Sequence, residues 1–261
     1  MGTALKAAAA ATAAAVAGAA TAIGALTTKA IEGYAAQEQL VGGVETLFKT
    51  SSDTVVGYAN DAYKTAGMSA NEYMETVTSF SASLLASMNN DTAAAAEKAN
   101  VAITDMSDNA NKMGTDISLI QNAYNGFAKQ NYTMLDNLKL GYGGTKEEMQ
   151  RLLDDASKLS GIKYDISSYS DVVDAIHVVQ TEMGITGTTA KEASTTIEGS
   201  VSSMSSAWDN WVAGMADSEA NFSQLTSNLV DSIVTVVGNI APRVIETVPR
   251  LVSGLGEIVE Q

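Results

Sequence analysis

The residues most open to a chemical interpretation are three glycines ahead of a lysine, in the stretch LKLGYGGTKEEMQRLL from Leu138 to Leu153. A phosphate-binding loop needs the order G-x-x-x-x-G-K-[ST] after a buried strand, because its backbone N–H groups surround phosphate while the lysine reaches the outer phosphoryl oxygens. Here Lys146 stands one place late and Glu147 follows it. The residues ahead have helical spacing, so the required strand is missing too. The stretch therefore predicts a turn and not a nucleotide site.

A helix start explains the same residues better. Thr145 has the residue type of an N-cap, and Glu148 stands three places later. In a capping box the first side chain accepts from the N3 amide while the glutamate reaches back to the N-cap amide. We expect this arrangement between Thr145 and Glu148.

Other candidate catalytic or metal-binding groups are few. The single histidine, His177, lies in the apolar run AIHVV, where a packed and hydrogen-bonded role is commoner than a ligand or base. Asp105, Asp108 and Asp116 do not follow the D-x-[DN]-x-[DN]-G order of a calcium loop, and no G-x-S-x-G nucleophile motif occurs. With no cysteine in the chain, thiol chemistry is excluded. We expect that the protein is not an enzyme and that it has no metal site and no cofactor.

The composition predicts the fold class. Of the 261 residues, 46% are hydrophobic, only 6% are aromatic and two are proline. Alanine is abundant, which favours helices. We expect an all-α fold: a multi-helix bundle with an Ala-rich N-terminal helix and a long amphipathic, coiled-coil-like C-terminal helical region. Thirty acidic against fifteen basic side chains give a net charge of −15, which repels phosphate backbones and argues against sequence-specific nucleic-acid binding.

The first expected region is residues 1–30. No charge occurs between Lys6 and Lys29, and nine of the eleven residues from 7 to 17 are alanine. A cleaved signal peptide and a conditional membrane segment are two interpretations. We favour a helix that packs closely on others through small residues. The small residues that we expect at such contacts are Ala14, Gly18, Ala22 and Ala25.

The second expected region is a helical core bundle over residues 31–190. Ser69 to Glu72 reads as a capping box, Asp91 as the N-cap of an Ala-rich helix, and Ser170 as the N-cap of a helix that Gly184 ends. Short connections rich in Gly, Asn and Ser separate these helices, as in a bundle of consecutive helices.

The third expected region, residues 191–261, carries apolar residues at alternating spacings of four and three. This predicts one long helix, or two with a break near Asp217, with a stripe suited to a coiled coil or to docking on the bundle. Pro242 can start a helix and Pro249 should kink one. The predicted self-assembly seam consists of Ile197, Val201, Met204, Trp208, Trp211, Met215, Phe222, Leu225 and Leu229.

Several long blocks resemble the core region of phage tail tape measure proteins. They are AIEGYAAQEQLVGGVETLF, AYKTAGMSANEYMETVTSFSASLL, DMSDNANKMGTDISLIQNAYNGFAKQ, QNAYNGFAKQNYTMLDNLKLGYGGTKEEMQRLL and GITGTTAKEASTTIEGSVSSM. The blocks run from about Ala30 to Met204 in the family's order, and the similarity continues loosely to Pro242.

The resemblance implies a structural protein of a phage, prophage or tailocin tail. Such proteins form helical assemblies in the tail lumen, act as rulers during tube assembly with tail assembly chaperones, and leave the tail ahead of the DNA. It implies self-association, tail tube and chaperone partners, a place in the virion after assembly in the host cytoplasm, and contact with the host membrane on ejection. Fully helical, 261 residues reach at most about 390 Å, which is short for a ruler, so a fragment or a short-tail variant is expected.

A membrane-active protein is the alternative function. It would insert residues 4–29 together with residues 229–241. The second segment has only thirteen residues and contains Asp231, so on these bounds it is too short to span a bilayer.

Overall fold

All of the regular secondary structure in the described part of the chain is helical. The computed structural model describes the backbone of residues 2–259 and the side chains of residues 24–245. No strand occurs within residues 2–259, which confirms the expected all-α class. The elements are α1 (Gly2–Phe48), η1 (Lys49–Ser51), α2 (Ser52–Thr65), α3 (Ala70–Ser87), α4 (Thr92–Met113), α5 (Ile117–Phe127), η2 (Leu135–Leu138), α6 (Lys146–Ser160), α7 (Tyr169–Glu182), α8 (Thr188–Thr195), α9 (Ile197–Gly214) and α10 (Phe222–Val259).

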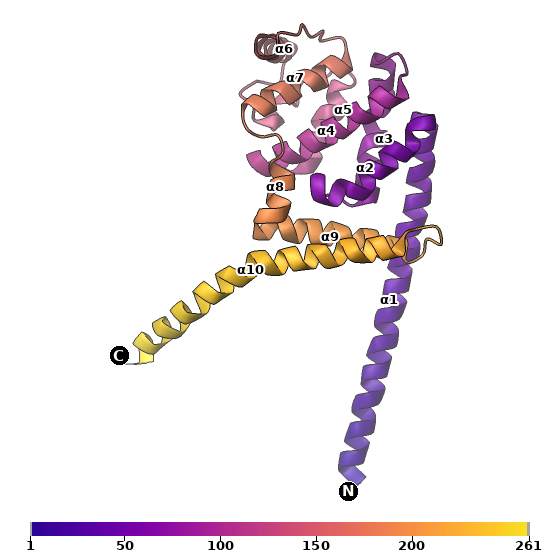
Figure 1. Cartoon of the computed structure of the whole chain (residues 1–261), viewed down its shortest axis with the longest axis vertical. Coiled ribbons are helices and arrows are strands. Elements are labelled where there is room, and N and C mark those ends of the chain that lie inside the picture. The colour runs from indigo at the N-terminus through magenta and orange to yellow at the C-terminus, as the bar shows by residue number, and fades with distance from the viewer. Residues whose placement is uncertain (1, 260–261) are drawn as a thin grey trace.

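A bundle of α2 to α7 and the end of α1 holds the main hydrophobic core. Residues 128–145, which include η2, connect α5 to α6, and α8 leads from the bundle to α9 (Figure 1). Its core is continuous and combines aromatic, aliphatic and alanine side chains. Large side chains that are almost completely buried include Tyr73, Tyr124, Phe127, Ile103 and Met106.

The expected helix starts are mostly confirmed. Ser69 and Glu72 form both halves of a capping box at α3, and the Asp91 carboxylate accepts from the Ala93 and Ala94 amides at α4. The start of α7 was predicted two residues late. Ser168, and not Ser170, is the N-cap, because its hydroxyl accepts from the Asp171 amide.

Helix α1 is a single long element that leaves the bundle (Figure 1). It passes through residue 30 without a break, so the boundary expected there falls inside a helix. Among its described side chains, Val44 and Phe48 near its end belong to the main core, and Ala30 is buried outside that core. Close packing occurs at Gly33, where a Cβ would lie 3.2 Å from the Ala213 Cβ on α9. Ala25 is exposed, contrary to the expected contact, because the helix lies outside the bundle there.

Three of the predicted contact residues cannot be compared with the structure. Ala14, Gly18 and Ala22 lie outside the residues whose side chains are described. The predicted kink at Pro249 falls outside them as well.

Helices α9 and α10 form a hairpin, which we call the α9–α10 hairpin. They pack side by side, and residues 215–221 connect them, so the chain breaks near Asp217 as the two-helix prediction placed it (Figure 1). Pro242 does not start a helix as predicted, because α10 begins at Phe222 and continues through it. Upstream packing of α10 on α9, through residues such as Leu229, outweighs the local cost of an interior proline.

Candidate functional site

The glycine-rich stretch is a packed turn. The Thr145 hydroxyl accepts from the Glu148 amide at 3.2 Å, but the expected return contact is wrong. Glu148 Oε2 instead accepts from the Gly143 amide at 3.0 Å, and the glutamate also pairs with Arg151. A Cβ on Gly144 would lie only 2.3 Å from the Thr133 carbonyl oxygen. The glycine therefore permits a close backbone approach.

His177 is hydrogen-bonded, as expected, to a buried aspartate. Its Nδ1 lies 2.9 Å from Asp105 Oδ2 and 3.0 Å from Oδ1, which joins α7 to α4. Asp105 is 1% exposed, whereas the His177 side chain is 38% exposed. The hydrogen bond to Asp105 raises the pKa of His177, and burial raises the pKa of Asp105. The Lys98–Asp174 ion pair also joins these helices. The arrangement is a structural link between α4 and α7.

The other two aspartates considered for a calcium loop have separate structural roles. Asp108 is fully buried and accepts from the backbone amides of Gly187 at 2.5 Å and Thr189 at 2.7 Å, which fixes the start of α8 on α4. Asp116 caps α5 by accepting from the Ser118 amide. Over the described part of the chain no group of three His, Asp or Glu side chains is placed to hold a metal ion.

The structure divides the predicted seam between two environments. Leu229 is buried in a small cluster with Tyr63 and Ala207, and Met204 and Trp211 pack against this cluster. Leu225 is half-buried. The remaining seam residues are exposed, and they are Ile197, Val201, Trp208, Met215 and Phe222.

An aromatic group joins the two helices of the hairpin. The Trp211 ring centroid lies 5.3 Å from that of Trp208 and 5.5 Å from that of Phe222. The Trp211 Nε1–H donates to the Thr226 hydroxyl at 3.1 Å. Part of the seam therefore holds α9 against α10.

Small and polar residues, and not the large apolar seam side chains, dominate the buried face of α9. The Ser206 hydroxyl donates to the Gly67 carbonyl at 3.0 Å, and the Asn210 side-chain oxygen accepts from the Ala70 amide at 2.7 Å. The buried residues of this face are Ser200, Ser203, Ser206, Ala207, Val212, Ala213 and Gly214. Small residues let helices approach closely, which leaves the larger seam side chains on other faces.

Sequence reasoning missed a second apolar stripe, on the solvent side of α10. We call it the outer stripe: Val230, Val234, Val237 and Val244, which are 51%, 64%, 59% and 50% exposed. Their spacings of four, three and seven repeat the pattern that defined the predicted seam, so the sequence held a signal for it. The predicted seam reaches α10 at Phe222, Leu225 and Leu229, and its last residue, Leu229, is buried, while the outer stripe lies on another face of the same helix.

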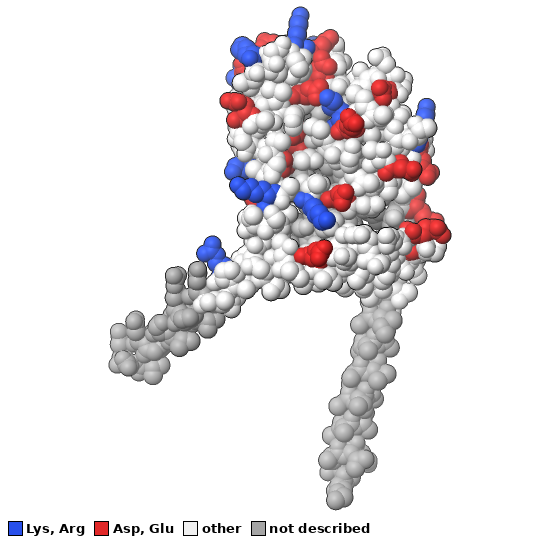
Figure 2. All heavy atoms as spheres, viewed as in Figure 1, with Lys and Arg blue, Asp and Glu red and all other residues white. Residues whose placement is uncertain are grey.

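The outer stripe lies on a nearly uncharged part of the surface. Residues 222–245 carry only Asp231 and Arg243 as charged side chains. Charged residues gather over the bundle, while the described part of α10 is largely free of them (Figure 2). A contiguous exposed apolar surface is typical of a site for protein or membrane contact. The outer stripe is therefore the best candidate functional site on the hairpin.

Helix α10 provides a longer apolar segment than the residues 229–241 considered from the sequence. Phe222–Ile245 has 24 residues and is long and apolar enough to cross a membrane by length and composition, with 17% of its most apolar window buried. The thirteen residues considered from the sequence were too few because the helix begins earlier and continues through Pro242.

Comparisons with protein-family models, with curated proteins and with solved structures found no match. The described part of the chain contains a helical bundle with a buried core, long helices that extend from it, and an exposed apolar surface on α10.

Proposed function

We propose that this chain is a structural protein of a phage tail, the core region of a tape measure protein, which assembles through the outer stripe. The observation that carries the proposal is the exposed apolar surface along α10. Heptad-like spacing on a long helix suits side-by-side packing with other helices. The ordered sequence blocks between Ala30 and Met204 supply the family-level part of the proposal.

Charge supports a role in a DNA-conducting tube. With a net charge of −15, the chain repels the DNA backbone and would let DNA pass with little binding. The outer stripe is the part of the surface where copies approach with little like-charge repulsion, because only Asp231 and Arg243 are charged between residues 222 and 245. Copies of the chain, tail tube protein and assembly chaperones are the proposed partners. The proposed locations are the host cytoplasm and then the tail lumen.

Co-expression tests this proposal. A tagged chain would be produced with the tail tube and tail assembly chaperone proteins encoded beside it, and the complex isolated by its tag. We expect at least one of these proteins to co-purify, and the Val234→Asp variant to lose that partner, because a charge on the outer stripe opposes apolar packing. Recovery of the tagged chain without any of them would contradict the proposal.

A membrane-active role is the second candidate, and one observation favours it. Phe222–Ile245 matches a bilayer in length, and little of it is buried against the rest of the chain. The charged groups to be accommodated are Asp231, which lies inside the segment and is costly in a membrane, and Arg243, which lies close to its end. The host membrane is then the partner on ejection.

Leakage of dye from lipid vesicles separates the two candidates. Membrane activity predicts leakage with the intact chain and its loss in Val234→Asp, since a second carboxylate would oppose insertion. A chain that co-purifies with tail proteins and causes no leakage supports assembly alone.

A further inference from the structure

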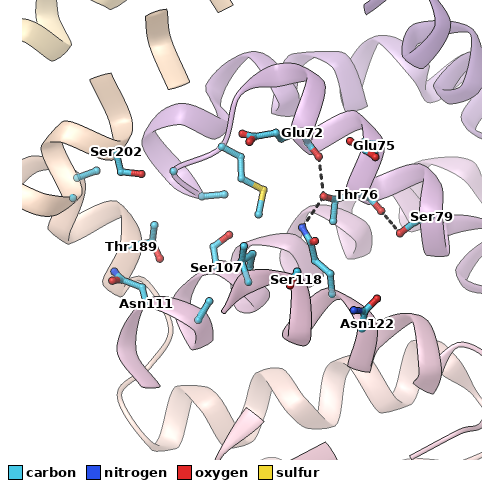
Figure 3. Close-up of a pocket in the computed structure, with 18 of the residues that line it drawn as sticks. Glu72, Glu75, Thr76, Ser79, Ser107, Asn111, Ser118, Asn122, Thr189 and Ser202 are labelled. Carbon is cyan, nitrogen blue, oxygen red and sulfur yellow. Dashed lines mark hydrogen bonds between the residues drawn. The ribbon is translucent and has the colours of Figure 1, made fainter. Parts of the chain in front are cut away.

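A cavity of about 640 Å³ lies where α3, α5, α8 and α9 meet α4. Glu72, Glu75 and Thr76 lie along one wall, and Thr189 and Ser202 lie across the cavity from them (Figure 3). This volume is in the range of small-molecule sites. No residue of the described part of α10 lines the cavity, so the site is distinct from the proposed assembly surface.

All of the charged side chains that line the cavity are acidic. Its lining residues include the carboxylates of Glu72, Glu75 and Glu198, several side-chain amides and hydroxyls, and no Lys, Arg or His. Glu72 is committed to the α3 cap through Oε2, which accepts from the Ser69 amide at 2.8 Å. Glu75 and Glu198 are exposed at the cavity and form no ion pair within the described side chains. The site therefore selects for a cationic ligand.

Two buried hydroxyls of the lining have no hydrogen-bond partner. They are Ser107 Oγ on α4 and Thr189 Oγ1 on α8, and Ser107 is 5% exposed. Figure 3 shows both side chains at the cavity. Asp108 holds Thr189 in place through its backbone amide at 2.7 Å. Because buried polar groups are nearly always paired, these hydroxyls are sites for a ligand's N–H groups.

The shape of the site favours an extended cation over a metal ion. The described carboxylates do not converge in a group that could hold a metal. Apolar parts of the lining, including Met68 and Ile117, suit methylene groups between separated charges. We propose that this cavity binds an aliphatic polyamine, with ammonium groups at Glu75 and Glu198 and N–H groups donating to Ser107 and Thr189.

Calorimetric titration of the full chain with spermidine, at low ionic strength, tests the proposal. We expect saturable binding at one site. The Glu75→Gln/Glu198→Gln variant should bind at least about tenfold more weakly, because charge-assisted hydrogen bonds are lost. Ser107→Ala should weaken binding by about threefold to tenfold by removing one acceptor. 1,8-Octanediol, an uncharged chain of similar length, should not bind.

A matched variant separates this site from general charge attraction. Glu45→Gln/Glu147→Gln removes two exposed carboxylates that do not line the cavity, so its net charge equals that of the Glu75/Glu198 variant. It should bind spermidine like the unchanged chain. Equal weakening in both double variants, or no weakening in either, would overturn the proposal, and thermal unfolding curves would verify that every variant is folded.

Discussion

The bundle and the α9–α10 hairpin use their large apolar side chains in opposite ways. In the bundle, side chains such as Ile103 and Tyr124 are completely buried. In the hairpin, small residues such as Ser203 and Ala213 are buried, while Trp208 and Val234 are 43% and 64% exposed. A surface that keeps large apolar groups in water gains most from a partner. The difference supports the proposal that the hairpin packs against a partner, whereas the bundle buries most of its large apolar side chains in its own core.

The largest expected effect is on the free energy of unfolding, when an isoleucine of the bundle and an isoleucine of the hairpin are each replaced by alanine. Ile103→Ala should lower the free energy of unfolding by about 2–5 kcal/mol, because it opens a cavity in a sealed core. Ile245 on α10 is 72% exposed, so Ile245→Ala should change it by less than about 0.5 kcal/mol. Urea unfolding of both variants measures the difference. Similar losses would mean that the hairpin end is as tightly packed as the bundle.

The next largest effect on stability is expected in the glycine-rich turn before α6, and it tests whether this connection is as tightly packed as the core. Gly144→Ala should cost about 1–3 kcal/mol, because its Cβ would lie 2.3 Å from the Thr133 carbonyl oxygen, a backbone atom that cannot easily move. At Gly143 a Cβ would lie 3.5 Å from the Glu148 Cγ, an ordinary contact, so Gly143→Ala should cost less than about 1 kcal/mol. Thermal unfolding of both variants checks this, and equal midpoints would show that the turn adjusts freely.

A smaller effect concerns the polar link between α4 and α7. The pKa of His177 is raised by Asp105, so the stability it contributes is fully present below its ordinary value near 6.5 and is lost as pH rises through the raised value. Burial raises the pKa of Asp105 in the unchanged chain and in a His177 variant alike, so the pH dependence of the difference between them is assigned to the imidazole.

His177→Gln should therefore cost most at low pH and least at high pH, by under about 1 kcal/mol since the imidazole is partly exposed to water. Urea unfolding between about pH 5 and 8 measures this trend. Lys158→Gln removes an exposed ion pair with Asp155 that does not titrate in this window, so its effect should stay constant. A flat profile for His177→Gln would show that the link carries no charge.

Sequence patterns predicted the helical class and most of the helix starts, because capping depends on residues a few places apart. Ser69, Glu72 and Asp91 are such cases. Long-range placement was not predictable in the same way. Asp105 and His177 are 72 positions apart, and the seam pattern gave no sign that serines would face the bundle. The outer stripe had a readable spacing, but which apolar face of α10 lies against α9 depends on the packing of the whole hairpin.

The smallest expected effect on stability accompanies a large one on association. Val234→Ser/Val237→Ser should change the free energy of unfolding by less than about 0.5 kcal/mol per site, because both side chains are mostly in water. If copies pack through the outer stripe, each valine covered there contributes about 1.5 kcal/mol. Both copies of a pair carry the two changes, so the double variant should weaken self-association about 100-fold or more. Light scattering across a dilution series measures the mass of the assembly.

A control variant, Leu159→Ser/Ile162→Ser, changes two exposed apolar residues at the end of α6 and after it, and should leave the mass of the assembly unchanged. A mass that is equally insensitive to both double variants would place any assembly surface elsewhere, and the exposed valines of α10 would then have to be covered by a different partner.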